Sequence, residues 1–223
     1  MTRPLAELTD VEHPAWPELR IAIDRSDTPV TVLRTTRERG EQTLHRLQVT
    51  TRSVLGALAL ECGGLLVDHG WLRILGGGAH GIPDLAEANA LTEPDESTEP
   101  PPFLLVAHDV LGGRFAVDGG GLGVAPGQVC HFAPDSLRWA GLEVGHGEFV
   151  HAMVSGAATQ FYDGMRWPGW EDDCAGLGPH EGFSLYPPPF SQEGADLAAV
   201  SRRQVPLTEL FAYYDDAARQ LGG

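Results

Sequence analysis

Residues 64–76 read Gly64-Leu-Leu-Val-Asp-His-Gly-Trp-Leu-Arg-Ile-Leu-Gly76, and two apolar runs in this stretch flank the dipeptide His69-Gly70. Each run, Leu65 to Asp68 and Trp71 to Leu75, has the length of a strand. The glycine suits a tight turn, because glycine adopts positive φ without steric cost. The stretch therefore predicts a β-hairpin near the middle of the chain.

Other segments of strand length lie on both sides of this hairpin. Residues 103–107 form a continuous apolar run, and residues 114–117 and 129–132 are two more candidates. Upstream, residues 30–33 have a β-like composition, and the apolar run 54–60 is also expected to be a strand. Together with the hairpin, these segments predict one sheet.

Helix signals are concentrated at the two ends of the chain. Near the start, Pro14 and Pro17 suit a first turn, and apolar residues follow at helical spacing. Thr35, with Glu38 three residues later, has the pattern of a capping box. The C-terminal helix has the clearest pattern, with Pro206 before it, Gly222 after it, and apolar positions at Leu207, Leu210, Phe211, Tyr214, Ala218 and Leu221.

These segments predict an α+β fold, with a mixed or mostly antiparallel sheet of about five to six strands and helices at the N- and C-terminal ends. A length of 223 residues suits a single domain that covers residues 1–223. Residues 83–102 contain six acidic residues, no basic residue and several prolines. This segment is therefore expected to be an acidic, proline-rich insertion or loop within that domain.

The chain is strongly acidic, with 31 aspartate and glutamate residues against 15 arginines and a formal net charge of −16. Nucleic acid and anionic membranes are poor partners for such a surface, because their phosphates are repelled. A basic protein would be attracted and steered towards it, although solubility alone also accounts for the charge. Among macromolecules, the composition therefore favours a basic protein partner.

Cysteine usage and hydropathy favour a cytoplasmic location. Cys62, Cys130 and Cys174 are odd in number, widely spaced and without a CxxC pair, which is typical of reduced thiols. No window approaches 18 uncharged apolar residues, and the first ten residues lack the pattern of a signal peptide. We therefore expect a cytoplasmic protein.

The familiar catalytic and cofactor motifs are not found in the sequence. Residues 76–81 satisfy the spacing GxGxxG, but Pro83 and the acidic stretch follow where a dinucleotide site requires a long helix. The chain has no lysine for a P-loop, no GxSxG elbow, and no histidine or cysteine spacing typical of a metal site. No cofactor or metal is expected, and no catalytic residue is assigned.

One set of polar and aromatic residues remains as a candidate binding site. Asp68-His69 and His108-Asp109 stand at the expected ends of strands, where binding residues often lie. Arg166 stands among aromatic residues and has the chemistry to hold an anion, while tryptophans in such a loop more often pack against a core. The candidate residues are Asp68, His69, Trp71, His108, Asp109, Arg166, Trp167 and Trp170.

Four stretches, read together, resemble one bacterial protein family. On these stretches the chain is identified as a member of the family called domain of unknown function 2625, from about Pro4 to about Leu221. Membership implies a cytoplasmic bacterial protein and implies no activity. The stretches are Leu47-Gln-Val-Thr-Thr-Arg-Ser53, the hairpin segment 64–76, Phe132-Ala-Pro-Asp-Ser-Leu-Arg-Trp139, and Gln160-Phe-Tyr-Asp-Gly-Met-Arg-Trp-Pro-Gly-Trp-Glu171.

A more distant resemblance is one of pattern. A strand-rich middle with a Gly-Trp-Leu triplet, an aromatic strand that runs into Phe132-Ala-Pro-Asp-Ser, and closing helices are similar to the SUKH superfamily. Many bacterial members of that superfamily are immunity proteins that neutralise toxins, often nucleases. The resemblance implies a SUKH-like fold and a protein partner, but no functional residue is carried over.

Three hypotheses on function follow from these observations. The first is a protein-binding module of immunity-protein type, whose partner is a basic protein such as a toxin. The second is a small-molecule-binding protein or enzyme, with its site near Asp68/His69, His108/Asp109 and the segment 166–170. The third is an oligomer-forming structural protein. Without a catalytic motif, the sequence favours binding over catalysis.

Overall fold

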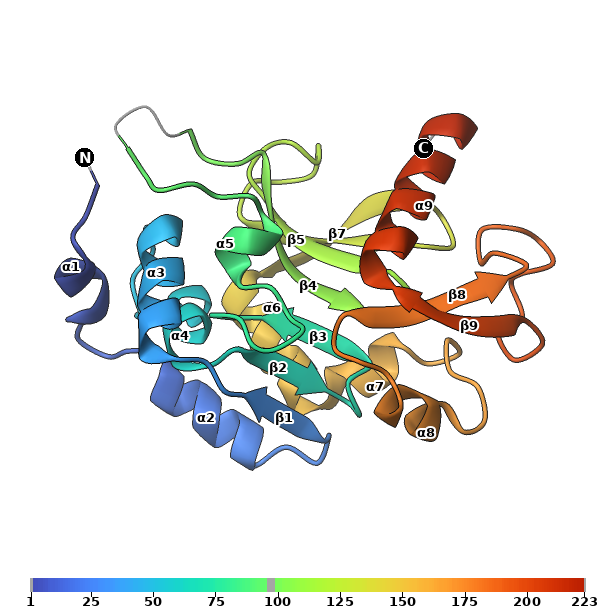
Figure 1. Ribbon diagram of the computed structural model, residues 1–223, viewed down its shortest axis with the longest axis horizontal. Helices are drawn as coiled ribbons and strands as arrows, with labels where there is room; N and C mark the ends of the chain where they lie inside the picture. The colour runs from blue at the N-terminus through green and yellow to red at the C-terminus, as the bar shows by residue number, and fades with distance from the viewer. Residues whose placement is uncertain (1, 96–98, 223) are drawn as a thin grey trace.

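A seven-stranded antiparallel sheet forms the centre of the protein, whose computed structural model describes residues 2–95 and 99–222 (Figure 1). Each strand pairs with the next along the chain. The strands are β1 (Val30–Leu33), β2 (Gly64–Val67), β3 (Leu72–Leu75), β4 (Phe103–Asp109), β5 (Arg114–Asp118), β6 (Gln128–Ala133) and β7 (Arg138–Gly145). A second, two-stranded sheet consists of β8 (Glu181–Tyr186) and β9 (Ser201–Pro206).

Helices cover both faces of the large sheet. On one face, Phe149 of α6 and Phe161 of α7 contact Phe115 of β5; on the other, Phe211 of α9 contacts His108 of β4 (Figure 1). The helices before β4 are α1 (Leu5–Thr9), α2 (Trp16–Asp24), α3 (Arg37–Leu47), α4 (Val54–Glu61) and α5 (Leu85–Ala88). Those after β7 are α6 (His146–Ala152), the segment η1 (Met153–Ala157), which is kinked at Gly156, α7 (Ala158–Phe161), α8 (Trp170–Ala175) and α9 (Leu207–Leu221).

The α+β class and the mostly antiparallel sheet predicted from the sequence are confirmed. The large sheet has seven strands where five to six were expected. Its last strand, β7, was not predicted, because Gly141 and Gly145 weaken the strand pattern. The C-terminal helix is confirmed as α9, which ends at Gly222 in the left-handed conformation.

The hairpin predicted over residues 64–76 is confirmed as β2 and β3. Val67 pairs with Leu72, and the turn between them contains four residues rather than the two predicted. Asp68, His69 and Gly70 all have positive φ, at 54°, 56° and 81°. Aspartate and histidine, like asparagine, adopt this left-handed backbone more readily than most residues with a side chain, so the sequence Asp68-His69-Gly70 suits the turn.

The strand predicted over residues 54–60 is wrong, because these residues form helix α4. Ser53 caps the helix by accepting a hydrogen bond from the backbone N–H of Gly56 at 3.1 Å. Residues 56–60 are all buried, so the apolar residues surround the helix and leave no amphipathic periodicity. A short apolar run of this kind cannot be assigned to a helix or a strand from its pattern.

The cap of α3 also differs from the sequence prediction, by one residue. Thr36, and not Thr35, accepts the hydrogen bond from the backbone N–H of Arg39, at 3.2 Å. Thr35 instead donates to the carbonyl of Gly77 at 3.0 Å. Adjacent threonines offer equivalent capping side chains, and the tertiary contact of Thr35 decides between them.

Part of the acidic segment 83–102 packs on the domain. Asp84 and Glu87 form a capping box at the start of α5. Asn89 then donates to the carbonyl of Leu105 at 2.9 Å and accepts from its N–H at 2.6 Å, which attaches the segment to β4. Residues 96–98 lie outside the described part of the chain. That residues 1–223 form a single domain stays a prediction.

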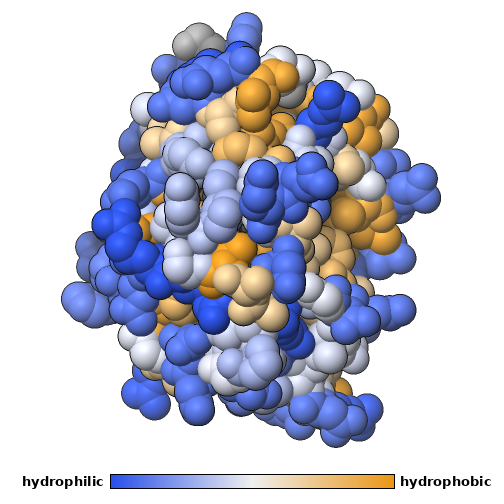
Figure 2. Space-filling model, turned by 90° about the vertical axis from the view of Figure 1, so that its right-hand side faces the viewer, coloured by the Kyte–Doolittle hydropathy of each residue, from blue (hydrophilic) through white to orange (hydrophobic). Residues whose placement is uncertain are grey.

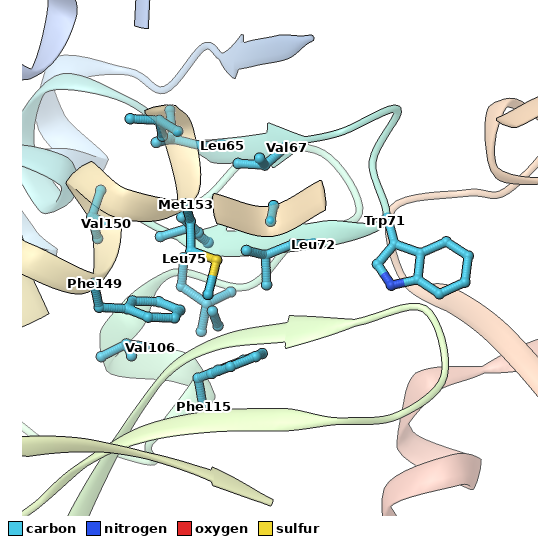
Figure 3. Packing of buried hydrophobic residues seen from close by; sticks show 14 of the residues in the cluster. Leu65, Val67, Trp71, Leu72, Leu75, Val106, Phe115, Phe149, Val150 and Met153 are labelled. Carbon is cyan, nitrogen blue, oxygen red and sulfur yellow. The ribbon is translucent and has the colours of Figure 1, made fainter. Parts of the chain in front are cut away.

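The hydrophobic core lies between β2–β5 and the helices α6 and η1 (Figure 3). Leu72 of the hairpin lies beside Met153 in Figure 3, while Phe115 of β5 and Phe149 of α6 pack at a ring distance of 5.0 Å. Full burial of such a side chain contributes about 1.5–3 kcal/mol. This packing positions the strand ends that carry the candidate residues. In the described ranges, none of the helices is both long and apolar enough to span a membrane.

We expect Gly40→Ala to destabilise the protein by about 1–3 kcal/mol, although alanine is the better helix former. A Cβ at this position of α3 would lie 2.5 Å from the carbonyl oxygen of Leu60, because α3 and α4 touch there. Gly147→Ala in α6 is the control, since its Cβ would meet Val54 at an ordinary 3.5 Å. Urea denaturation of both variants measures the difference; an equal effect would contradict close contact at Gly40.

Candidate binding site

Asp68 and Arg166, two of the candidate residues, form a buried ion pair at one end of the sheet. The Asp68 carboxylate, in the β2–β3 turn, accepts hydrogen bonds from Arg166 Nη2 and, at 3.5 Å, from Thr159 Oγ1. The exposed fraction is only 14% for the Arg166 side chain and 7% for Asp68. The pair therefore fastens the segment after α7 to the hairpin turn.

Aromatic rings enclose the Arg166 guanidinium. Its central carbon lies 4.2 Å from the ring centre of Trp170 and 5.5 Å from that of Trp71. Trp71 also packs against Trp167 at 5.4 Å, and His69 packs edge-on against Trp170 at 5.5 Å. A cation is attracted to an aromatic face, so Arg166 itself occupies the place that a cationic ligand would take. This cluster is a packing contact within the chain.

The local sequence explains why Trp167 and Trp170 reach the same cluster. Gly169 between them has a φ of 83° and directly precedes α8. The turn is closed by a hydrogen bond of 3.1 Å from the N–H of Trp170 to the carbonyl of Trp167. The indole of Trp167 donates to Asp173 at 2.6 Å, which satisfies its polar atom in a buried position.

Asp109 is connected to this cluster through Tyr162. The Tyr162 hydroxyl donates to Asp109 Oδ2 at 3.2 Å, and its ring packs against Trp71 at 5.7 Å. Asp109 Oδ1 accepts hydrogen bonds from the backbone N–H groups of Leu111 at 2.9 Å and Gly113 at 2.8 Å, which close the β4–β5 turn. Burial raises the pKa of Asp109 to about 6, against the opposing effect of these hydrogen bonds.

His108 is placed apart from the other seven candidate residues. Consecutive residues of a strand point to opposite faces, so the dipeptide His108-Asp109 is divided between the two sides of β4. The His108 ring packs against Phe211 of α9 at 5.9 Å. Burial, and secondly the charge of Arg73, lowers the pKa of His108 to about 3. The imidazole is therefore neutral and faces the α9 side of the sheet.

A cavity of about 260 Å³ adjoins Asp109. The ends of two strands line it, with Asp109 from β4 and His131 and Ala133 from β6. Its other walls come from the loop after α7, with Asp163 and Met165, and from residues 189–197 of the β8–β9 connection. Phe115 of β5 lies between β4 and β6 and pairs with His131. The cavity therefore lies on the face of the sheet to which Phe115 points, the face covered by α6 and α7.

His131 is the functional candidate that the sequence did not reveal. Its ring stacks on Phe115 at 4.6 Å and meets Phe161 edge-on at 5.1 Å. Within the described residues, its Nε2 atom is buried and has no hydrogen-bond partner. Burial lowers the pKa of His131 to about 4, despite the nearby charge of Asp135, so the ring is neutral at pH 7. Because Phe115 pairs with both Ala107 of β4 and His131 of β6, the strand register places His131 on the same face as Asp109.

A larger cavity of about 770 Å³ lies between α3, the acidic segment and the β4–β5 strands. The charged side chains Arg46 and Asp118 of this cavity already have partners. Arg46 pairs with Glu93 at 2.8 Å, and Asp118 accepts hydrogen bonds from the backbone N–H groups of residues 120, 122 and 124. The smaller cavity therefore has the stronger chemical signature of a ligand site.

The chemistry of the smaller cavity suits binding. It combines one buried carboxylate, one neutral imidazole and apolar walls, the usual composition of a small-molecule site. Over the described ranges, no group of three or more histidine, cysteine, aspartate or glutamate side chains is arranged to hold a metal ion. Cys62, Cys130 and Cys174 are buried, and burial raises the pKa of each thiol, which makes them poor nucleophiles.

Fold and site together define an α+β protein with a small cavity beside a buried aspartate. The chain belongs to the family described as protein of unknown function DUF2625, whose model matches residues 5–210. This confirms the family resemblance found in the sequence.

Two relatives match nearly the whole chain. The "Putative uncharacterized protein YbfG" of Escherichia coli (strain K12) is 37% identical over 214 residues, which cover 94% of each chain. An "Uncharacterized protein" of Haemophilus influenzae is 35% identical over 211 residues, which cover 94% of this chain and 91% of the relative. No solved structure matches significantly, so the similarity to the SUKH superfamily stays a prediction.

Proposed function

We propose that this protein binds a small molecule in the cavity between Asp109 and His131. The observation that carries the proposal is that two buried titratable side chains line one cavity, and within the described residues neither forms an ion pair. Burying such groups without a charge partner costs free energy. Titratable groups kept in that state beside a cavity are characteristic of functional sites.

The size and walls of the cavity support a small ligand. Its volume of about 260 Å³ lies just below the range of about 300–1,000 Å³ that holds drug-sized molecules. Leu111, Met165 and Leu197 supply apolar contacts, while Asp109 and His131 supply polar ones. A site of this composition would enclose a metabolite of modest size and orient it through one or two hydrogen bonds.

We expect Ala133→Leu to abolish ligand binding while the protein remains folded. Ala133 lines the cavity at the end of β6, and the larger side chain would occupy the ligand volume. Native mass spectrometry after incubation with a metabolite extract would detect the bound molecule on the wild type and not on the variant. A wild-type spectrum without any added mass would count against the proposal.

A protein partner is the second candidate, and the net charge of −16 favours it. A basic protein, such as a toxin bound by an immunity-type protein, would be steered towards this surface. The exposed acids Glu171, Asp172 and Asp173 of α8 offer a contact point. The face that carries α9 is largely hydrophilic, with separate hydrophobic patches (Figure 2). The three free, buried cysteines support a cytoplasmic location for such a partner.

Neutralising α8 tests the protein-partner proposal. The double variant Glu171→Gln, Asp172→Asn, which leaves the Asp173 partner of Trp167 in place, should lose most of the retained basic protein in affinity capture at low salt. Binding to the wild type should also weaken as salt is added, because the contact is electrostatic. Capture that is unaffected by both changes would contradict an acidic interface at α8.

A further inference from the structure

We infer that the ligand of the Asp109–His131 cavity is a small organic cation, whose ammonium group pairs with the Asp109 carboxylate. This inference rests on the proposed small-molecule function and specifies the chemical class of the ligand. It follows from the charges, the walls and the size of the cavity.

The charges at the cavity select against an anion. Three aspartates, Asp109, Asp135 and Asp163, line it, and its lining in the described chain includes no arginine. Asp109 is 3% exposed, whereas Asp135 and Asp163 are exposed at the rim. A carboxylate or phosphate ligand would face repulsion from all three, while a cation would be attracted at the rim and neutralised at the buried aspartate.

Among the described residues, the nearby arginines form no ion pair with Asp109, and of their charges only that of Arg73 acts on its pKa, lowering it. Arg73 lies on the neighbouring strand, but its guanidinium donates to the backbone carbonyls of Gly70 at 3.2 Å and Pro179 at 3.0 Å, and also to that of Glu181. Arg166 pairs with Asp68. Within the described ranges, Asp109 therefore receives hydrogen bonds only from the turn and from Tyr162, and Oδ2 has capacity for a further donor.

The rest of the lining suits an organic ligand. Leu111, Met165 and Leu197 form apolar walls that would contact the carbon chain of an amine. His131 is a neutral ring at the cavity, so it adds no positive charge that would oppose a cation. A volume of about 260 Å³ is sufficient for a short alkylamine.

Three probes of equal chain length and different charge test the inference: n-butylammonium, n-butanol and n-butyrate. Calorimetric titration of the wild type should show binding of butylammonium, weaker binding of butanol and none of butyrate. In Asp109→Asn, the affinity for butylammonium should fall at least thirtyfold, to near that of butanol, because the buried charge partner is lost. The asparagine Oδ1 still accepts from Leu111 and Gly113, so the turn is kept.

Each result of the titration with the three probes either supports or overturns the cation inference. Butyrate or butanol binding as tightly as butylammonium would overturn the cation inference and leave a small-molecule site in place. If none of the three probes binds, the cation inference fails, and native mass spectrometry with the Ala133→Leu control decides the broader proposal separately. Should Asp109→Asn not fold, Asp135→Asn with Asp163→Asn must weaken butylammonium at low salt and leave butanol unchanged; an unchanged butylammonium affinity would overturn the inference.

Discussion

Replacing Asp68 with asparagine is expected to lower the free energy of unfolding by about 3 kcal/mol, since removing one partner of a buried ion pair leaves the other charge uncompensated. Arg166, with only 14% of its side chain exposed, cannot regain its hydration. Asparagine is the suitable replacement, because it tolerates the φ of 54° at this position. Urea denaturation followed by tryptophan fluorescence at pH 7 measures the change.

An exposed ion pair provides the matched control for Asp68→Asn. Arg20 and Asp24 pair at 3.0 Å in α2, with 47% and 56% of their side chains exposed, so Asp24→Asn should cost less than about 0.5 kcal/mol. The double variant Asp68→Asn, Arg166→Met should recover much of the stability, because it removes the uncompensated charge and keeps the contact with Trp170. Equal costs for the two single variants would contradict a buried anchor at Asp68.

The secondary structure could be predicted where the sequence pattern of a segment fits only a helix or only a strand. The 64–76 hairpin and α9 each combined periodicity with a turn or end signal, and both are confirmed. Residues 54–60 were ambiguous, because a fully buried helix and a buried strand share the same apolar run. The pairing of β8 with β9 joins residues at least 15 apart in the sequence, beginning with Tyr186 and Ser201, which a local pattern does not reveal.

The candidate site was predictable only in part, for a geometric reason. Strand-end position identified Asp68 and Asp109, and composition identified Arg166 and the tryptophans around it. Sequence adjacency suggested that His108 acts with Asp109, yet alternation along β4 separates them. His131 was seen only as a strand residue, because its place beside Asp109 depends on the register of β5 and β6. Register between strands is a tertiary property.

Acidification from pH 7 to pH 5 is expected to lower the free energy of unfolding by about 4 kcal/mol. Three histidines with lowered pKa cause the loss: His108 at about 3, and His131 and His146 at about 4. In each case burial is the main cause, and each Nε2 lacks a hydrogen-bond partner in the part of the chain described. The unfolded chain binds protons near pH 6.5, whereas these buried rings stay neutral.

Acid lowers the free energy of unfolding because the unfolded chain binds more protons at these histidines than the folded protein does. Each histidine contributes stability that is present above about pH 6.5 and is lost as the pH falls towards its folded pKa. At pH 5 the loss is about 2 kcal/mol for each of the three residues. Asp109 acts in the opposite direction, because its pKa is raised to about 6 in the folded state. Its protonation below pH 6 favours folding by about 1–2 kcal/mol at pH 5, which reduces the loss of about 6 kcal/mol from the three histidines to about 4 kcal/mol.

A single variant separates the histidines from the rest of the pH dependence. His108→Leu removes one titrating ring from an apolar contact with Phe211 and should reduce the loss between pH 7 and pH 5 by about 2 kcal/mol. Urea denaturation at both pH values, on the wild type and the variant, gives the difference. A net loss of about 4 kcal/mol is a large part of the 5–15 kcal/mol typical of folded proteins. Equal stability of the wild type at pH 7 and pH 5 would show that the three rings are hydrated in the folded state, and that the sheet faces around His108 and His131 are open to water.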